Sequence, residues 1–307
     1  MNASQTLWAA SLACGRVLRM ALWHVVLLAI VQGLAELLPV SSSAHVVVAE
    51  KLMHMDPSSP EMTLLLVMLH TGTMFAVIVY FWKQWLRTYF QTAEAFKTFV
   101  VLLTVATGLT GIVGGGLIEL IEHFGFRGVP HAEVEQLFGR LDLIAPALLA
   151  AGILILIAGI YEKRHPPSAS PNDGLGVKQA SLIGIVQGLC LPFRGFSRSG
   201  ATISTGLLAN VTKQRAETFS FALAVVLTPL ADGRELWRLM KAGHIAGGAS
   251  WTSALMPSLL GAFCAFLAGL VALKWLSDWL ESDRWYLFGI YCLAAAVAVA
   301  CLHHIGY

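Results

Sequence analysis

Five long apolar runs place the strongest constraint on how this chain folds. Each is close to the roughly 20 residues that an α-helix needs to cross the hydrocarbon core of a bilayer. The runs cover residues 62–82, 98–121, 143–161, 253–275 and 285–305. A sixth run, residues 217–239, is weaker because the segment Asp232-Gly-Arg-Glu235 ends it. This pattern predicts an all-α polytopic membrane protein with about six transmembrane helices.

The composition agrees with a membrane-embedded chain. Only 12% of the 307 residues are charged and 57% are hydrophobic, whereas a soluble domain carries about 25% charged residues. The net charge of +2 is small, and the sequence has no basic patch of the kind that binds nucleic acid. We therefore expect a membrane partner and no nucleic-acid partner.

Two further apolar runs, residues 22–38 and 178–191, are each followed by a proline and a polar turn. After the turn, a shorter apolar stretch follows, at residues 44–53 and 200–211. Each half of such a pair is short for a full crossing. Non-helical backbone at membrane depth is tolerated only where protein or a water-filled cavity surrounds it. The sequence therefore predicts two re-entrant helix–turn–helix pairs.

The two pairs belong to a repeat that is visible in the sequence. Ile30-Val-Gln-Gly-Leu34 recurs as Ile185-Val-Gln-Gly-Leu189, and a proline and a serine-containing turn follow both copies. Each half combines one pair with three crossings, so the second half enters the membrane from the opposite face. This is an inverted-topology repeat, in which interrupted helices meet at a binding site near the midplane. We expect a single membrane domain over residues 1–307, with repeat one at about 22–161, a connector at about 162–177 and repeat two at about 178–305.

The first polar turn places a carboxylate in apolar sequence. Gln32 and Glu36 are four residues apart and share one helix face. Glu36 also lies in the last turn before a proline, where the helix dipole disfavours an acid. A buried carboxylate in this position requires a partner. His45, Arg198 and a metal ion are the three candidates.

Hydroxyl groups and an imidazole follow that carboxylate. Ser41 is a natural N-cap for the next helix. Ser42 and His45 are three residues apart and can share a face, which would join a nucleophile to a base. The alternative, in which the serines only cap the helix and His45 packs between helices, stays open at this point. His70 lies inside the 62–82 run, where it either lines the same cavity or packs against another helix.

The second polar turn carries anion-binding groups. Ser197 can cap the helix that follows, which places Arg198 in its first turn. A cation is unfavourable there unless an anion lies between it and the exposed backbone N–H groups. The arrangement predicts a phosphate cradle made of Ser197, Arg198, Ser199 and Thr202, with Arg194 as a second clamp. In the competing interpretation, Arg198 only pairs with Glu36. Together the two turns indicate phosphoryl chemistry on a lipid phosphate or diphosphate, whose chain would leave sideways between helices.

These motifs resemble those of the bacterial undecaprenyl-diphosphate phosphatase family, also called the bacitracin-resistance family. The resemblance rests on Gln32-x-x-x-Glu36 with Pro39-Val-Ser-Ser-x-x-His45, on Gly195-Phe-Ser-Arg-Ser-Gly-Ala-Thr202 and on Ala216-Glu-Thr-Phe-Ser-Phe221. It implies hydrolysis of undecaprenyl diphosphate to undecaprenyl phosphate and inorganic phosphate, which recycles the lipid carrier for peptidoglycan synthesis and confers bacitracin resistance. It also implies a bacterial inner-membrane protein with a periplasmic active site and a divalent cation, Mg²⁺ or Ca²⁺.

Carried over by position, the site residues of the family fall on Gln32, Glu36, Ser42, His45 and Arg198. Two departures matter. Gln32 stands where many members have Glu, so Glu36 is the only carboxylate of the motif and the single candidate metal ligand in it. This argues against a two-carboxylate metal site. The segment Pro192-Phe-Arg-Gly195 is longer than the common Pro-Gly form, which adds Arg194 as an extra phosphate contact.

The sequence thus leads to a mechanistic hypothesis and a rival. Ser42 attacks the terminal phosphorus or positions a water that does, His45 is the general base, and Glu36 orients His45 or binds the cation. The remaining substrate-binding candidates are Gln32, Ser41, Ser43, Gln187, Arg194, Ser197, Ser199 and Thr202. The rival is a transporter or flippase for polyprenyl phosphate, because inverted repeats with broken helices are a transporter architecture. The Ser–His pairing favours the enzyme, and a homodimer is left open.

The distribution of Lys and Arg gives a slight orientation signal. The loop at residues 162–178 contains Lys163, Arg164 and Lys178 beside turn residues, which favours the cytoplasm. The loop at residues 122–142 is more acidic, which favours the outer face.

Overall fold

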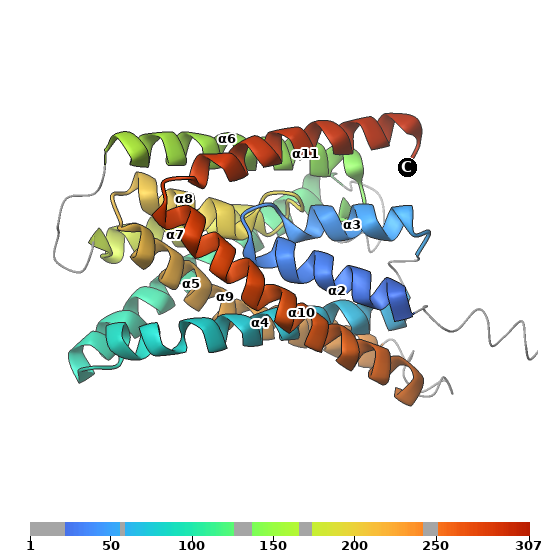
Figure 1. Ribbon diagram of the computed structural model, residues 1–307, viewed down its shortest axis with the longest axis horizontal. Coiled ribbons are helices and arrows are strands. Elements are labelled where there is room, and N and C mark those ends of the chain that lie inside the picture. The colour runs from blue at the N-terminus through green and yellow to red at the C-terminus, as the bar shows by residue number, and fades with distance from the viewer. Residues whose placement is uncertain (1–21, 56–58, 126–136, 166–173, 242–250) are drawn as a thin grey trace, which may run out of the picture.

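The computed structural model describes residues 22–55, 59–125, 137–165, 174–241 and 251–307, and these ranges are almost entirely helical (Figure 1). The helices are α2 (Leu22–Leu37), α3 (Ser42–Leu52), α4 (Pro60–Tyr89), α5 (Ala93–Gly125), α6 (Leu141–Arg164), α7 (Val177–Cys190), α8 (Arg198–Leu208), α9 (Lys213–Lys241), α10 (Trp251–Glu281) and α11 (Trp285–Ile305). Within the described ranges there is no β-strand. The prediction of an all-α protein is confirmed.

Five of the described helices are long and apolar enough to cross a membrane: α4, α5, α6, α11 and the Leu255–Glu281 part of α10. They coincide with the five apolar runs of the sequence. The sixth expected crossing is α9, a continuous helix of 29 residues that is less apolar than these five. Protein buries much of its first half, including Phe219 and Phe221, so that half needs no lipid-facing apolar surface. The chain is a multi-pass membrane protein.

Two pairs of short helices interrupt the long ones. α2 and α3 have 16 and 11 residues, and α7 and α8 have 14 and 11. At about 1.5 Å per residue they are roughly 17 to 24 Å long, whereas the hydrocarbon core is about 30 Å thick. α2 and α7 each end two residues before a proline, Pro39 and Pro192, because the residue ahead of a proline disfavours helical angles. The two short helix–turn–helix units are present as predicted, and their re-entrant course in the membrane stays a prediction.

Each short pair packs against a long helix from the other half of the sequence. α2 lies on α10, and α7 lies on α5. The repeated glycine permits both approaches. A Cβ added to Gly33 would lie 2.6 Å from Ala268 Cβ, and one added to Gly188 would lie 2.8 Å from Val113 Cβ. The two copies of the sequence repeat therefore form similar close helix contacts, which a side chain would push apart.

Replacing Gly188 by Ala is expected to lower the free energy of unfolding by about 1–3 kcal/mol, because the added methyl group overpacks the α5–α7 interface. The matched control is Gly108→Ala, since Gly108 is also helical and has open space around its Cβ position. Thermal unfolding of both variants in the same detergent measures the difference. Equal destabilisation by the two substitutions would contradict the role of close packing.

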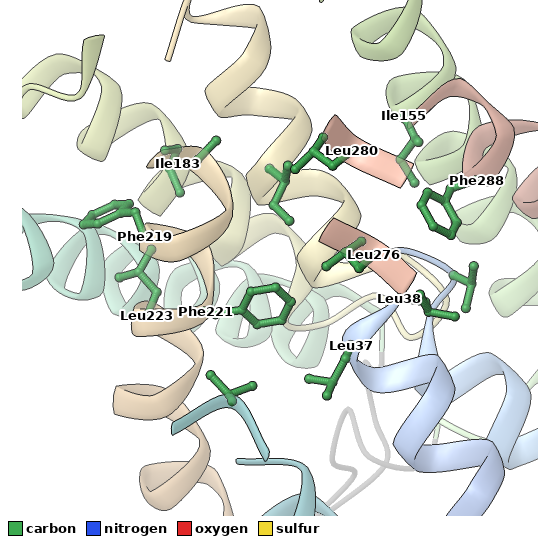
Figure 2. Packing of buried hydrophobic residues seen from close by; sticks show 14 of the residues in the cluster. Leu37, Leu38, Ile155, Ile183, Phe219, Phe221, Leu223, Leu276, Leu280 and Phe288 are labelled. Carbon is green, nitrogen blue, oxygen red and sulfur yellow. The ribbon is translucent and has the colours of Figure 1, made fainter. Parts of the chain in front are cut away.

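The turn after α2 rests on an apolar core shared by both halves. Figure 2 shows Leu37, the last residue of α2, and Leu38 of this turn together with Phe221 of α9 and Leu276 of α10, and all four belong to one buried cluster. Ile183 of α7 is a member of the same cluster. Apolar packing between the halves therefore fixes the polar turn in space. Along one edge of the molecule, α6 and α11 lie side by side (Figure 1).

Charged side chains meet where α6 ends and α9 begins. Lys213 Nζ lies 3.1 Å from Glu162 Oε1, and it also pairs with Asp283 in the turn between α10 and α11. Glu162 is only 4% exposed, so Lys213 offsets a charge that would be costly to bury alone. Residues 166–173 of the predicted connector and residues 126–136 of the predicted outer loop lie outside the described residues.

Candidate active site

Three contacts join the turn of the first helical pair to the turn of the second. Arg198 Nη2 donates to Glu36 Oε1 at 2.8 Å. Ser199 Oγ donates to the Leu38 carbonyl at 3.3 Å. The Gly195 N–H donates to a serine hydroxyl at the start of α3, also at 3.3 Å. The acceptor of that last bond is Ser43 Oγ. The two polar turns meet, as the sequence predicts.

Glu36 is the centre of this contact region. Its Oε2 accepts hydrogen bonds from Ser42 Oγ at 2.5 Å and from Gln32 Nε2 at 3.1 Å. The side chain is 14% exposed, so protein donors replace most of its water. Glu36 lies at the unfavourable end of α2, but it contacts the first residues of α3 and α8, and the positive ends of those helices favour a carboxylate. Arg198 supplies the partner charge that the sequence requires.

Arg198 uses only part of its guanidinium for this ion pair. Nη2 binds Glu36, whereas Nη1 is buried and has no hydrogen-bond partner among the described residues. Leaving a buried charged donor unpaired is costly, and an anionic oxygen is the natural partner for it. The geometry therefore allows Arg198 to bind an anion through Nη1 while Nη2 remains paired with Glu36.

His45 lies differently from the expectation. Its Nδ1 is 2.8 Å from the Ser41 carbonyl oxygen and its Nε2 is 2.7 Å from the Tyr291 hydroxyl. A carbonyl can only accept a hydrogen bond, so Nδ1 is protonated and donates to the Ser41 carbonyl. In the neutral ring, Nε2 then accepts a hydrogen bond from the Tyr291 hydroxyl. Ser42 and His45 do share a helix, but the Ser42 hydroxyl is turned toward Glu36. The predicted pairing of Ser42 with His45 is wrong for this arrangement, because the Ser42 hydroxyl donates its hydrogen bond to Glu36.

Several of the predicted hydroxyls hold the turns in shape. Ser41 caps α3 by accepting from the Ala44 N–H at 3.4 Å, and Ser197 caps α8 by accepting from the Gly200 N–H at 3.2 Å. Both capping predictions are confirmed. The backbone of Ser41 has φ of +68°, which a residue with a side chain rarely adopts. Ser41 Oγ also lies 3.3 Å from Ser43 Oγ.

Two of the predicted substrate contacts are buried in helix interfaces. Thr202 Oγ1 donates to the Arg198 carbonyl at 2.8 Å and lies 2.5 Å from Ser220 Oγ of α9. Gln187 Nε2 donates to Thr110 Oγ1 of α5 at 3.0 Å. Both side chains have an exposed fraction of 0%, so the interpretation as phosphate contacts does not match the structure. Helical threonines commonly bond back to their own helix in this way.

Arg194, the predicted second phosphate clamp, lies in the second polar turn. The guanidinium of Arg194 stacks on the ring of Phe138, just before α6, with its carbon 4.3 Å from the ring centroid. An arginine held in this way is ordered by a cation–π contact. Its contact with phosphate stays a prediction.

Thr202→Val is expected to lower the free energy of unfolding by about 1–2 kcal/mol, because it leaves Ser220 Oγ without its partner. Thr205→Val is the matched control, since Thr205 Oγ1 donates to the Ala201 carbonyl of its own helix at 2.7 Å. Thermal unfolding in detergent should show the larger loss for Thr202→Val, with turnover per folded molecule little changed. A loss of turnover without a loss of stability would restore Thr202 to the substrate site.

Comparison with known proteins now identifies the family. A family model described as "Bacitracin resistance protein BacA" matches residues 25–298. The chain belongs to the BacA family. It is 56% identical to undecaprenyl-diphosphatase 2 of Acinetobacter baylyi over 286 residues, which is 92% of this chain and 98% of that protein. It is 32% identical to undecaprenyl-diphosphatase 2 of Burkholderia thailandensis, over 91% of this chain and 95% of that protein.

The structure adds residues that sequence reasoning did not assign to the site of this BacA protein. His70 Nε2 of α4 lies 3.8 Å from Glu36 Oε2, and its Nδ1 lies 4.0 Å from Asp232 Oδ1 of α9. Sequence analysis left His70 undecided, and it took Asp232 only as the end of a span. Both are ionisable residues inside long helices of a membrane protein, which is a recognised signal of function. Tyr291 of α11 is a third such residue, but nothing in its sequence context marks it.

The described side chains do not fit a divalent cation held by the protein at Glu36. Both of its carboxylate oxygens already accept from Arg198, Ser42 and Gln32. No group of three His, Cys, Asp or Glu side chains among the residues described gathers closely enough to hold a metal ion. His70 separates Asp232 from Glu36 by using opposite ring nitrogens. We therefore assign no catalytic step to a metal bound by Glu36.

Proposed function

We propose that the protein hydrolyses undecaprenyl diphosphate to undecaprenyl phosphate and inorganic phosphate. It is a phosphatase that acts on a phosphoric anhydride. Membership of the BacA family and 56% identity to a protein named undecaprenyl-diphosphatase support this function. In the site, the supporting observation is the free Nη1 of Arg198 beside the hydrogen-bonded Ser42 and Glu36. The product is the lipid carrier for cell-wall synthesis, and this recycling accounts for bacitracin resistance.

In this proposal the diphosphate binds where the two turns meet. Arg198 Nη1 donates to a phosphate oxygen while Nη2 stays on Glu36. The N-termini of α3 and α8, which begin at Ser42 and Arg198, add backbone N–H groups and positive dipole ends. Because Arg198 and Glu36 neutralise one another, these partial charges carry much of the binding. The prenyl chain leaves between helices into the lipid.

Ser42 is the proposed nucleophile and Glu36 its proton acceptor. The 2.5 Å hydrogen bond between them allows the carboxylate to take the proton as Ser42 Oγ bonds to the terminal phosphorus. The bond from that phosphorus to the bridging oxygen breaks, and undecaprenyl phosphate leaves. Water then hydrolyses the phosphoserine and releases inorganic phosphate. The alternative, in which Ser42 positions an attacking water, uses the same acceptor.

We propose that a divalent cation, Mg²⁺ or Ca²⁺, binds together with the substrate. A diphosphate ester carries more negative charge than Arg198 offsets, and hard cations prefer phosphate oxygens. The cation would therefore arrive with the substrate instead of residing on Glu36.

Phosphate release by purified protein in detergent tests the proposed function. Undecaprenyl diphosphate is supplied with and without a chelator, and inorganic phosphate is measured over time. Release by the wild type supports the phosphatase. Lipid binding without release would contradict it and favour a transporter of the same lipid. Loss of release on chelation, restored by Mg²⁺ or Ca²⁺, supports the cation.

We further propose an inverted-topology repeat in the bacterial inner membrane, with the site open to the periplasm. The packing of α2 on α10 and of α7 on α5 supports the repeat, because exchanging the two halves exchanges these contacts. The basic end of α6, with Lys163 and Arg164, supports a cytoplasmic connector. Labelling of a cysteine at position 163 by an impermeant maleimide, in a cysteine-free background, tests the orientation. The homodimer stays a prediction, which the mass of the detergent-solubilised protein tests.

A further inference from the structure

Tyr291 of α11 lies against the first polar turn although it is 246 residues from His45. Its hydroxyl is 2.7 Å from His45 Nε2, and the two rings stack with centroids 5.7 Å apart. The next residue, Cys292, donates from its thiol to the Pro39 carbonyl at 3.3 Å. Two consecutive residues of α11 thus hold the turn that presents Ser42.

The Tyr291 side chain is 47% exposed and lies on a strongly apolar helix. α11 is one of the five described helices that are long and apolar enough to cross a membrane, and two apolar side chains that flank Tyr291 on it, Ile290 and Val297, are 48% and 63% exposed. A tyrosine hydroxyl on such a helix needs a protein acceptor wherever water does not reach it. His45 Nε2 provides that acceptor and is fixed by it.

The other nitrogen of His45 transmits this constraint to the backbone. Nδ1–H donates to the Ser41 carbonyl at 2.8 Å. Ser41 has the left-handed φ of +68°, a strained conformation that persists only where surrounding contacts enforce it. Ser42 follows directly and points its hydroxyl at Glu36. The contacts form a strut that runs from Tyr291 through His45 to the Ser41 carbonyl.

We propose that Tyr291 is a positioning residue for the phosphatase: through His45 it holds the Ser41 backbone in the conformation that aims Ser42 at Glu36. The inference rests on the proposed function of the same site. It gives His45 a role that does not require contact with Ser42. It also explains why the ring nitrogens of His45 face Ser41 and α11 instead of the nucleophile.

A double-mutant cycle tests the strut. Tyr291→Phe removes the hydroxyl and keeps the ring, and His45→Ala removes the link. In the wild-type background, Tyr291→Phe should lower kcat about five- to tenfold with little change in KM, as expected for loss of one hydrogen bond that acts on geometry. In the His45→Ala background it should have no further effect, because a shared path makes the two losses non-additive.

The control is Tyr286→Phe, on the same helix, whose ring lies beside Lys163 instead of the site. Its kcat should equal that of the wild type. Unfolding temperatures confirm that all variants are folded. Additive losses in the cycle, or wild-type kcat in Tyr291→Phe, would overturn the strut while leaving the phosphatase intact. Absence of phosphate release from the wild type would instead overturn the function itself.

Discussion

Arg198→Ala is expected to reduce kcat/KM for undecaprenyl diphosphate by about 10³-fold or more, one of the two largest losses expected for this protein. Arg198 joins the two turns by an ion pair with Glu36, and it retains a buried Nη1 without a partner in the described structure. Charge develops on the transferring phosphoryl group, and a guanidinium that is already oriented stabilises it without reorganisation.

Arg198→Lys separates charge from geometry. Lysine keeps the positive charge but loses the planar fork that can bind Glu36 and a phosphate oxygen together. We expect partial activity, between that of the wild type and that of Arg198→Ala. Arg194→Ala is the matched control from the same turn. Its kcat/KM should fall tenfold or less, which is the loss expected for a single hydrogen bond.

Stability must be measured beside activity, because Arg198→Ala leaves the Glu36 carboxylate buried without its charge partner. The unfolding temperature in detergent and the elution profile establish that the variant is folded. A folded Arg198→Ala protein with turnover close to that of the wild type would exclude Arg198 from the transition state.

Ser42→Ala should reduce turnover by about 10³-fold or more if Ser42 Oγ attacks phosphorus, since removal of the nucleophile leaves only binding and electrostatic stabilisation. The Ser42 hydroxyl is 2.5 Å from Glu36 Oε2. Ser43→Ala is a suitable comparison, because Ser43 Oγ accepts a backbone N–H from the second turn at 3.3 Å and lies 3.3 Å from Ser41 Oγ. Its loss should be far smaller.

Residual activity decides between the two nucleophile schemes. If Ser42→Ala retains a tenth or more of wild-type turnover, water is the nucleophile and Ser42 only positions it. Mass spectrometry of wild-type protein quenched during turnover provides the second measurement. A phosphate group on Ser42 supports the covalent scheme, and Glu36→Gln should prevent its formation.

Much of the architecture follows from local patterns in the sequence. Apolar runs of membrane length gave the five spans, and proline with a serine-containing turn gave the two helical pairs and both caps, Ser41 and Ser197. The contact between Arg198 and Glu36 was also predictable, because a buried carboxylate requires a cation and the repeat brings the two turns together. These features depend on short-range preferences or on one strong electrostatic requirement.

The failures concern choices between partners at similar spacing. Helical periodicity placed Ser42 and His45 on one face, but a hydroxyl binds the strongest acceptor in reach, which is Glu36 from another helix. The face of α8 that carries Thr202 was equally ambiguous, because a helix has a ligand side and a packing side with similar residues. Tyr291 and Asp232 come from helices far along the chain, and only tertiary packing brings Tyr291 to His45 and Asp232 to His70.

The packing of α2 in the first half on α10 in the second half has a consequence for synthesis of the protein. Gly33 packs on Ala265 and Ala268, which the ribosome adds about 230 residues later, or roughly 10–45 s at bacterial elongation rates. Until then, α2 and its carboxylate lack their native neighbour in the bilayer. The active site is therefore completed only near the end of translation, and an incomplete chain cannot be an active one.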